Sequence, residues 1–267
     1  MQLSVYQIDA FTKEAFKGNP AAVVPLSAWL PDHVLAAMAR EHNQSETAFF
    51  VPVEDGAHDF ELRWFTPTRE IDLCGHATLA TSFVIFDQLG FTVDEIRFKT
   101  RFVGDLFVRR VGDYLELDFP ARIGKPTKDE FNFLSMLNIS VKPTAILRTD
   151  RDFYFVFEDE SLIRNVKPDF HALKQQKIWP CITAPGKDCD FVSRFFTAGD
   201  GLDEDPVTGS THCTLVPYWS ERLGKTDMIA RQLSERGGTL KVALDGSRVK
   251  IAGQAVLYSE GQISLSL

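Results

Sequence analysis

Two apolar segments of the chain each begin and end with a glycine. One runs from Gly75 to Gly90 and the other from Gly209 to Gly224, with identical spacing between the glycines. Both segments are predicted to be helices, and the first turn of a helix presents unpaired N–H groups and a partial positive charge. A glycine at that point allows a ligand close to the backbone. The two helix starts are therefore predicted to bind a small carboxylate.

The sequence around these segments is duplicated. RWFTP at residues 63–67 is matched by RFFTA at 194–198, and each is followed by an acidic stretch and one of the apolar segments. Residues 104–112 and 253–261 also match in their glycine spacing, which indicates a duplicated hairpin. A single glycine would more often mark only the start of a buried helix. Because both glycines recur at matched spacing, the anion site is favoured over that simpler interpretation.

The elements that must position these helix starts are mostly strands. An amphipathic helix is predicted at 30–41 and a strand at 47–53, so Glu46 lies at a helix-to-strand junction. Further strands are predicted at 3–10, 60–66, 144–147 and 153–157, hairpin strands within 96–119, short helices at 129–137 and 167–175, and closing strands after residue 239.

The duplication predicts two lobes of about half the chain each. The first is assigned to residues 1–118 and the second to 119–255. The last hairpin resembles the one that ends the first lobe. We therefore expect the C-terminal strand, at about 256–267, to return and complete the N-terminal sheet.

Composition excludes several classes of partner. The formal net charge is −8 and no Lys/Arg cluster appears, which argues against nucleic acid and anionic membranes. No apolar run has transmembrane length, and the N-terminus lacks the features of a signal peptide, so a cytoplasmic location is expected. The four cysteines form no C-x-x-C pair and are expected to be reduced thiols: Cys74, Cys181, Cys189 and Cys213.

Four strings carry a resemblance to a known family: QIDAFTKEAFKGNPAAVV, SETAFFV, FTPTREIDLCGHATLA and DPVTGSTHC. Over essentially its whole length, the chain resembles the PhzF family, the phenazine-biosynthesis isomerases and their relatives. The resemblance implies an α/β (α+β) fold of the diaminopimelate-epimerase-like type. In that fold two pseudo-symmetric lobes each wrap a sheet around a central buried helix, with the active site in the cleft between them. It also implies a homodimer that uses no cofactor.

The resemblance also implies roles for individual residues. The family's acid/base glutamate corresponds to Glu46 in SETAFF. One carboxyl group can take a proton from one carbon and return it to another, and burial is expected to raise its pKa toward neutrality. The archetype acts in this way on trans-2,3-dihydro-3-hydroxyanthranilate. The residues implied to bind the small carboxylate substrate are His76, Asp205 and Ser210, beside Gly75 and Gly209.

Each of these residues also has a simpler interpretation. A glutamate at a helix-to-strand junction is commonly solvated or caps a helix, and Asp205 has the position of an N-cap. His76 can be a buried histidine whose hydrogen bonds are satisfied. The family signature favours the functional roles over these alternatives.

A thiol mechanism is the main competing chemistry, since related racemases and epimerases use two facing cysteines. Cys74 directly precedes Gly75, where a helix start lowers the pKa of a thiol. The matching residue before Gly209 is Thr208, however, and Cys213 lies four residues into the helix. The thiol pair is therefore broken, and two-base epimerisation by Cys74 is the less favoured alternative.

Two further alternatives are weaker. A zinc site built from Cys74, His76, His212 and Cys213 has no standard ligand spacing, so no metal is expected. A protein that only binds small acids would have no need of Glu46, since a buried polar set costs stability unless it has a role. The sequence does not identify the substrate.

Overall fold

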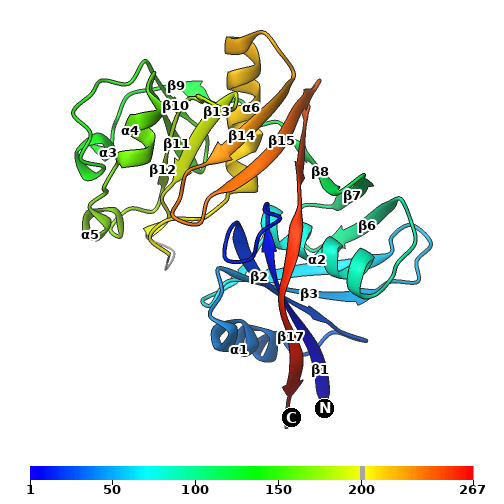
Figure 1. Ribbon diagram of the computed structural model, residues 1–267. Coiled ribbons are helices and arrows are strands. Elements are labelled where there is room, and N and C mark those ends of the chain that lie inside the picture. The colour runs from blue at the N-terminus through cyan, green and yellow to red at the C-terminus, as the bar shows by residue number, and fades with distance from the viewer. Residues whose placement is uncertain (199–201, 267) are drawn as a thin grey trace. The chain divides into compact units, whose positions relative to one another are not determined.

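The computed structural model describes residues 1–198 and 202–266 and divides them into two compact units. The first unit comprises Met1–Phe119 and Ile251–Leu267, and the second Pro120–Lys250. The chain therefore leaves the first unit once and returns to it for its last strand, drawn in red in Figure 1.

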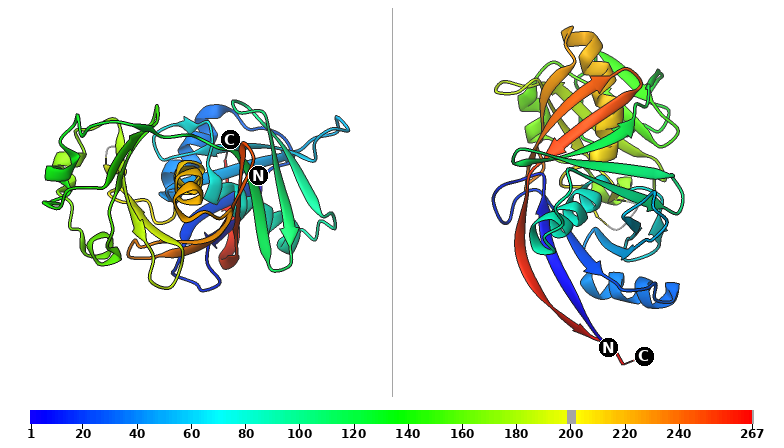
Figure 2. Two further views of the ribbon diagram at one scale, coloured as in Figure 1. Left: turned by 90° about the horizontal axis from the view of Figure 1, so that it is seen from above. Right: turned by 90° about the vertical axis from the view of Figure 1, so that its right-hand side faces the viewer.

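The first unit is built on a mixed sheet. Its strands follow the order β17, β1, β2, β3, β4, β6, β7, β8, in which β2–β3 and β4–β6 are the parallel pairs. Strand β17 runs antiparallel to the whole of β1, and Figure 2 shows both termini at the same end of this pair. The bounds are β1 Gln2–Ala10, β2 Asn19–Pro25, β3 Glu46–Pro52, β4 Phe60–Phe65, β5 Glu70–Ile71, β6 Glu95–Thr100, β7 Asp105–Val111, β8 Tyr114–Pro120 and β17 Ala255–Ser264.

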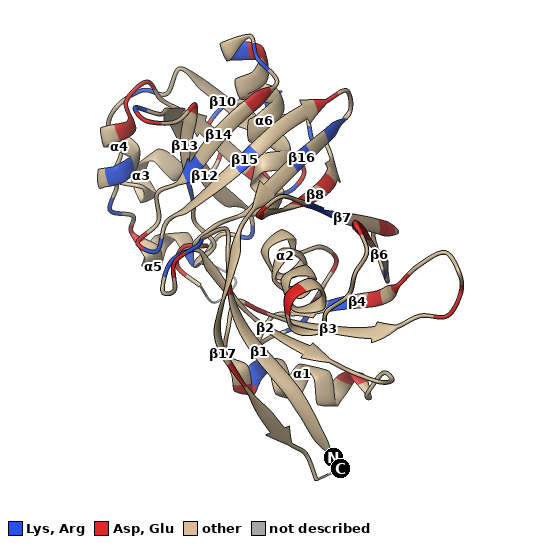
Figure 3. Cartoon of the chain, turned by 45° about the vertical axis from the view of Figure 1, so that its right-hand side comes forward, with Lys and Arg blue, Asp and Glu red and all other residues tan. Residues whose placement is uncertain are grey.

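Helix α2 (Gly75–Phe83) is the buried centre of the first unit and continues as a π-helix, η1 (Val84–Gln88). Every residue from 75 to 82 is buried, and α2 packs against β1, β2 and β3. Apart from His76 and Asp87 the segment carries no ionisable side chain, and its ribbon is mostly tan in Figure 3. A helix that is apolar on all sides must be buried, so the predicted central helix is confirmed. The other helix of this unit is α1 (Asp32–His42).

The second unit repeats this plan. Its strands follow the order β9, β10, β11, β12, β13, β14, β15, with β11–β12 and β13–β14 parallel. The strands are β9 Lys125–Pro126, β10 Ala145–Arg148, β11 Asp152–Val156, β12 Trp179–Pro185, β13 Phe191–Phe195, β14 Asp227–Gln232, β15 Gly238–Asp245 and β16 Arg248–Gly253. The helices are α3 Phe133–Met136, α4 Glu160–Asn165, α5 Phe170–Leu173 and α6 Gly209–Leu223.

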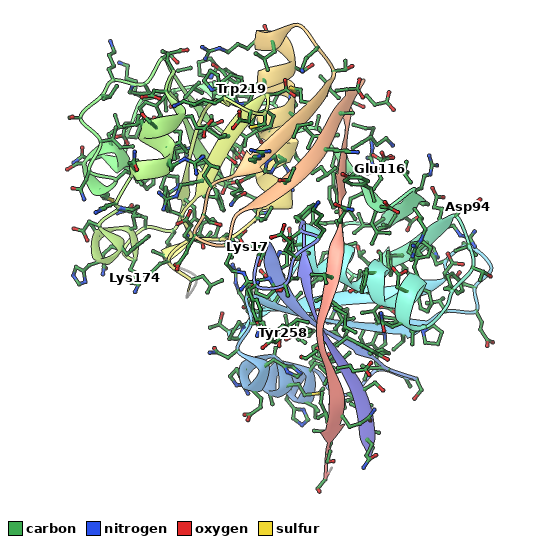
Figure 4. The ribbon with its side chains drawn as sticks, in the orientation of Figure 1. Lys17, Asp94, Glu116, Lys174, Trp219 and Tyr258 are labelled. Carbon is green, nitrogen blue, oxygen red and sulfur yellow. The ribbon has the colours of Figure 1, made fainter. Side chains whose placement is uncertain are left out.

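Helix α6 is the buried helix of the second unit. Figure 4 labels Trp219 on it, a fully buried side chain that stacks on Phe191 and donates from Nε1 to the Thr183 hydroxyl at 3.0 Å. Pro217 lies inside α6 and has no N–H, so the carbonyl of Cys213 loses its helical donor. The backbone N–H of Arg122 donates to that carbonyl at 2.9 Å. The proline is thus accommodated by a hydrogen bond from outside the helix.

The internal repeat is visible in the pairing of strands. The series β2, β3, β4, β6, β7 and the series β11, β12, β13, β14, β15 both pair parallel, antiparallel, parallel and antiparallel. In each series the buried helix is inserted before the fourth strand. The two halves therefore share one topology.

The predicted hairpin at residues 253–261 is wrong. Gly261 lies inside β17 and pairs with Val5. The counterpart of the turn at Gly112, between β7 and β8, is the turn at Gly246, between β15 and β16. Gly112 and Gly246 have φ angles of +59° and +56°, a conformation that glycine adopts without strain.

None of the helices within the described residues is both long and apolar enough to cross a membrane.

Candidate functional site

Glu46 and His76 face each other in the first unit. Glu46 is the first residue of β3, and His76 is the second residue of α2. His76 Nε2 lies 3.1 Å from Glu46 Oε2, and the exposed fractions of the two side chains are 4% and 17%. A carboxylate thus meets an imidazole at the start of a buried helix, and the carboxylate keeps some access to solvent.

Two more side chains hold His76 in place, and the sequence interpretation gave neither of them a role. The amide Nδ2 of the fully buried Asn19 lies 3.0 Å from His76 Nδ1. The Ser45 hydroxyl lies 3.3 Å from His76 Nε2. Both residues belong to strings that carry the family resemblance, KGNP and SETAFF. The presence of a polar residue in each of these strings was the sequence feature that could have indicated a role for Asn19 and Ser45.

The turn before Asn19 depends on glycine. Gly18 has a φ of +66°, and a Cβ atom there would lie 2.1 Å from the carbonyl oxygen of Ala10. Any other residue would clash with that backbone atom and adopt a strained conformation. Gly18 therefore sets the point at which β2 begins and where the Asn19 amide meets His76.

The electrostatics of the pair differ from the sequence expectation. Burial alone would raise the pKa of Glu46, but the positive charge of His76 and hydrogen bonds from His76 and Ser45 lower it below its ordinary value. The expectation of a pKa raised toward neutrality is therefore wrong. Burial opposes the imidazolium, yet the electrostatic interactions and hydrogen bonds of the ring with Cys74 and Glu46 raise the pKa of His76 well above its ordinary value. The pair is a carboxylate facing an imidazolium.

Cys74 completes this cluster. Its Sγ lies 3.5 Å from His76 Nδ1. Burial, and the nearby charge of Glu46, raise the pKa of the Cys74 thiol. The helix start therefore does not produce a thiolate, and Cys74 keeps its proton.

The four residues considered for a zinc site, Cys74, His76, His212 and Cys213, do not all face one another. Glu46, Cys74 and His76 form the one group of three ligand-type side chains found within residues 1–198 and 202–266, with ligand atoms within 4.8 Å of one another. His212 is turned to its own helix, where Nδ1 donates to the Thr208 carbonyl at 2.7 Å, and burial lowers its pKa to about 4. A thiolate ligand would require deprotonation of Cys74, against its raised pKa.

Asp205 is tied to the loop that enters α6. Its Oδ2 accepts a hydrogen bond from the Thr208 hydroxyl at 2.6 Å, and its carbonyl accepts one from Gln232 Nε2 at 2.7 Å. Gln232 Oε1 in turn accepts from the Thr208 backbone N–H at 2.9 Å. The N-cap of α6 is Thr208, whose own side chain makes no capping hydrogen bond, so Asp205 does not occupy the N-cap position. The N-cap interpretation of Asp205 is therefore wrong.

Ser210 is the second residue of α6 and is half-buried, directly after Gly209. It occupies the position in α6 that His76 occupies in α2. Glu46, His76 and Gly75 belong to the first unit, whereas Asp205, Gly209 and Ser210 belong to the second.

A bidentate ion pair anchors the loop before each helix. Arg63 Nε and Nη2 donate to Glu70 at 2.7 and 2.8 Å. Arg194 Nε and Nη2 donate to Glu204, both at 2.7 Å. Both arginine side chains are almost completely buried. The arginine that begins each copy of the RWF and RFF repeat thus forms a buried ion pair with a glutamate further along the chain. We call these two ion pairs the arginine clamps.

Comparison with known proteins identifies the family. The family model for phenazine biosynthesis-like proteins, PhzC-PhzF, matches residues 8–261. The chain belongs to this family. An uncharacterized isomerase of Pseudomonas aeruginosa is 48% identical over 99% of this chain and 100% of that protein. The crystal structure of a PhzF family protein of Enterococcus faecalis superimposes with a TM-score of 0.92, at 42% identity, over 99% of this chain and 100% of that one.

More distant structures share the fold alone. A hydroxyproline epimerase from Agrobacterium vitis superimposes with a TM-score of 0.62 at 11% identity, covering 99% of this chain and 93% of that one. The expected diaminopimelate-epimerase-like class, with a sheet around a buried helix in each unit, is confirmed. Membership of the PhzF family supports an isomerase or epimerase-like activity.

Proposed function

We propose that this PhzF family protein is an isomerase that moves a proton between two carbons of a small, carboxylate-bearing substrate, without a cofactor. The observation that carries this proposal is the Glu46–His76 pair at 3.1 Å, placed at the start of the buried helix α2, which carries no other charged side chain. A cyclic amino acid of the trans-2,3-dihydro-3-hydroxyanthranilate type is the substrate class that the family resemblance suggests.

Glu46 is the proposed general base and general acid. Its lowered pKa keeps it ionised at neutral pH, so the free enzyme holds the base form. The carboxylate takes a proton from a substrate C–H bond, and the electron pair of that bond stays in the conjugated system of the substrate. The protonated Glu46 then returns the proton to a different carbon. Atoms and charge balance, and no redox step is needed.

The remaining residues of the site are proposed to bind the substrate. The N–H groups at Gly75 and Gly209 would donate hydrogen bonds to a substrate carboxylate, since a helix start favours negative charge. His76 and Ser210 would hydrogen-bond polar substrate groups, and Asp205 would orient an amine.

Asn19 and Ser45 are proposed as positioning residues. They contact the two ring nitrogens of His76, at 3.0 and 3.3 Å, and so fix the plane of the ring toward Glu46. Nδ1 of an imidazolium carries a proton, so when the ring is charged the Asn19 amide must turn its oxygen to that atom. An imidazolium held in this plane stabilises the carboxylate form of Glu46. Proton transfer would then depend on Asn19 even though it does not touch the substrate.

The thiol alternative is less favoured for two reasons. The pKa of Cys74 is raised, so the thiol is not poised as a base. The residue at the same position before α6 is Thr208, which has no acid/base chemistry near neutral pH. A non-catalytic small-acid-binding protein is the remaining alternative. We also propose a homodimer and a cytoplasmic location, both on the family resemblance.

Proton NMR in D2O tests this proposal directly. The purified protein is incubated with dihydrohydroxyanthranilate and a panel of cyclic amino acids, as wild type, Glu46→Gln and Glu54→Gln. Glu54 is an exposed glutamate two residues beyond the end of β3 and serves as the matched control. We expect deuterium incorporation or double-bond migration in wild type and Glu54→Gln, and none in Glu46→Gln. Full turnover by Glu46→Gln would refute the assignment, and saturable binding without turnover by wild type would favour the binding-only alternative.

A further inference from the structure

The second unit contains a pocket that the proposed reaction does not use. It has a volume of about 700 Å³ and lies beside the short pair of strands β9 and β10 and the turn between β10 and β11. Figure 1 shows β9 and β10 next to each other in this unit. All its lining residues fall between 122 and 151, so it is formed within the second unit.

The pocket gathers positive charge in an acidic protein. Four cationic side chains line it, Arg122, Lys125, Arg148 and Arg151, against a single carboxylate, Asp150. The chain as a whole has a net charge of −8. Grouped like charges repel one another and cost stability unless an anion offsets them.

Most of this charge has no ion-pair partner. Arg148 is the exception, since its Nη1 lies 3.0 Å from Glu130 and its guanidinium lies over the ring of Phe153. Among residues 1–198 and 202–266, Arg122, Lys125 and Arg151 form no salt bridge within 4.0 Å. The buried carboxylate of Asp152 is near enough for the charges of Arg151 and Arg122 to act on it, and they lower its pKa against the larger effect of burial. Nη1 of Arg151 is buried and has no hydrogen-bond partner there. A buried donor left without an acceptor costs stability, which a hydrogen bond to an anionic ligand would recover.

The walls of the pocket are held by backbone contacts. The N–H of Arg122 donates to the Cys213 carbonyl that Pro217 leaves free. On the other side, the Thr149 hydroxyl accepts from the N–H groups of Arg151 and Asp152, at 3.4 and 3.1 Å. The backbones of Arg122 and Arg151 are therefore held in place by hydrogen bonds, which limits the positions their side chains can reach. Preorganised donors lose less entropy on binding than mobile ones.

We propose that this pocket binds the phosphate group of a small molecule. Guanidinium groups donate two parallel hydrogen bonds to phosphate oxygens, and Thr127 adds a hydroxyl-bearing side chain to the lining. A volume of about 700 Å³ is in the range of small-molecule sites and exceeds that of phosphate itself. The site is separate from the residues proposed for proton transfer.

Isothermal titration calorimetry with pyrophosphate, at constant ionic strength, tests the proposal. We compare wild type with the double variant Arg122→Gln/Arg151→Gln and with Lys142→Gln/Lys177→Gln. The second pair removes the same charge from exposed positions of the same unit that do not line the pocket. We expect the arginine variant to bind at least about tenfold more weakly, because two charge-assisted contacts are lost, and the lysine variant to bind as wild type does. Absence of binding to wild type, or equal weakening in both variants, would overturn the proposal.

A third variant tests the pocket without disturbing the core, and a second ligand tests its preference for phosphate over carboxylate. Lys125 is exposed, so Lys125→Gln does not disturb the core and should weaken pyrophosphate binding by about threefold. Succinate carries two carboxylates and serves as the comparison anion. Tighter binding of succinate than of pyrophosphate would contradict the phosphate assignment. Unchanged binding in Lys125→Gln, together with a folded arginine variant of wild-type affinity, would also contradict it.

Discussion

The two units share a topology but differ in the chemistry placed on it. Strand registers align them: Arg63 pairs with Phe49 in the first unit, and Arg194 with Ile182 in the second. Three residues before each partner, the first unit carries Glu46 and the second Trp179. The proposed acid/base group therefore has an apolar counterpart that transfers no proton.

The helix starts differ in the same way. Cys74 and His76 of α2 correspond to Thr208 and Ser210 of α6. Histidine gains and loses a proton near neutral pH, whereas serine and threonine hydroxyls only donate and accept hydrogen bonds. What the units have in common is the arginine clamp, including the arginine over the ring two residues on. The arginine clamps and the strand pairs thus maintain the shared fold in both units. A few side chains at strand and helix starts distinguish the unit that is proposed to transfer a proton from the unit that is not.

The largest expected effect comes from replacing these counterparts one at a time. Glu46→Gln should lower turnover by about 10²–10⁴-fold, because the only proposed proton acceptor is lost. Trp179→Phe changes the corresponding position in the second unit and should retain most of the activity. Steady-state rates on whichever substrate is identified by NMR provide the measurement. Comparable losses in both variants would mean that the two positions are not chemically distinct.

The clamps should matter equally in both units. Arg63→Gln and Arg194→Gln each leave a mostly buried glutamate without its bidentate partner. We expect each to lower the free energy of unfolding by about 3 kcal/mol, the usual cost of breaking a buried pair. Chemical denaturation of the two variants beside wild type measures this. A large loss of unfolding free energy in only one of the two variants would show that the two arginine clamps do not contribute equally to stability.

Asp152 gives the second unit a pH dependence that its counterpart lacks. The registers align it with the buried Ala21 of the first unit. Burial raises the pKa of Asp152 from 3.8 to about 6, so between these pH values the unfolded state binds fewer protons than the folded state. Stability therefore falls as pH rises through that window, by on the order of 3 kcal/mol at neutral pH.

Asp152→Asn should remove this penalty. The variant should be more stable than wild type at pH 7.5 and gain almost nothing at about pH 3, which lies below both pKa values, so that Asp152 is mostly protonated in the folded and the unfolded state. Thermal melting at the two pH values measures the difference. An equal change at both would show that packing, and not ionisation, is responsible.

A smaller effect is expected from the positioning residue Asn19. Asn19→Ala removes the amide that lies 3.0 Å from His76 Nδ1 and should lower kcat by about tenfold with little change in KM. A purely structural role would lower the melting temperature without moving the pH profile of the remaining activity. We expect the alkaline limb of that profile to move, because the environment of His76 has changed.

Sequence reasoning succeeded where periodicity and spacing were strong. The segments at 75–88 and 209–223 and the first strand were predicted because their apolar patterns are long. The helices expected at 129–137 and 167–175 shorten to Phe133–Met136 and Phe170–Leu173. Such short helices depend on tertiary packing, which no local pattern records.

The site itself was predicted only in part. Family motifs pointed to Glu46 and His76, which the structure brings together. The roles of Asn19 and Ser45 and the lowered pKa of Glu46 require knowing which side chains meet across β2, β3 and α2. The hairpin at 253–261 failed because glycine spacing alone does not distinguish a turn from a strand interior.

The pH dependence of kcat/KM tests the central claim most directly, because it reports whether Glu46 and His76 act as an ion pair. Glu46 must be ionised to accept a proton, and the charge of His76 holds its pKa below the ordinary value of a glutamate. His76 must be protonated, and its pKa lies well above the ordinary value of a histidine. We predict full activity between these values, a loss in acid as Glu46 is protonated, and a loss in alkali as His76 loses its proton. An acid limb near neutral pH would contradict the account, because Glu46 would then be neutral in the free enzyme.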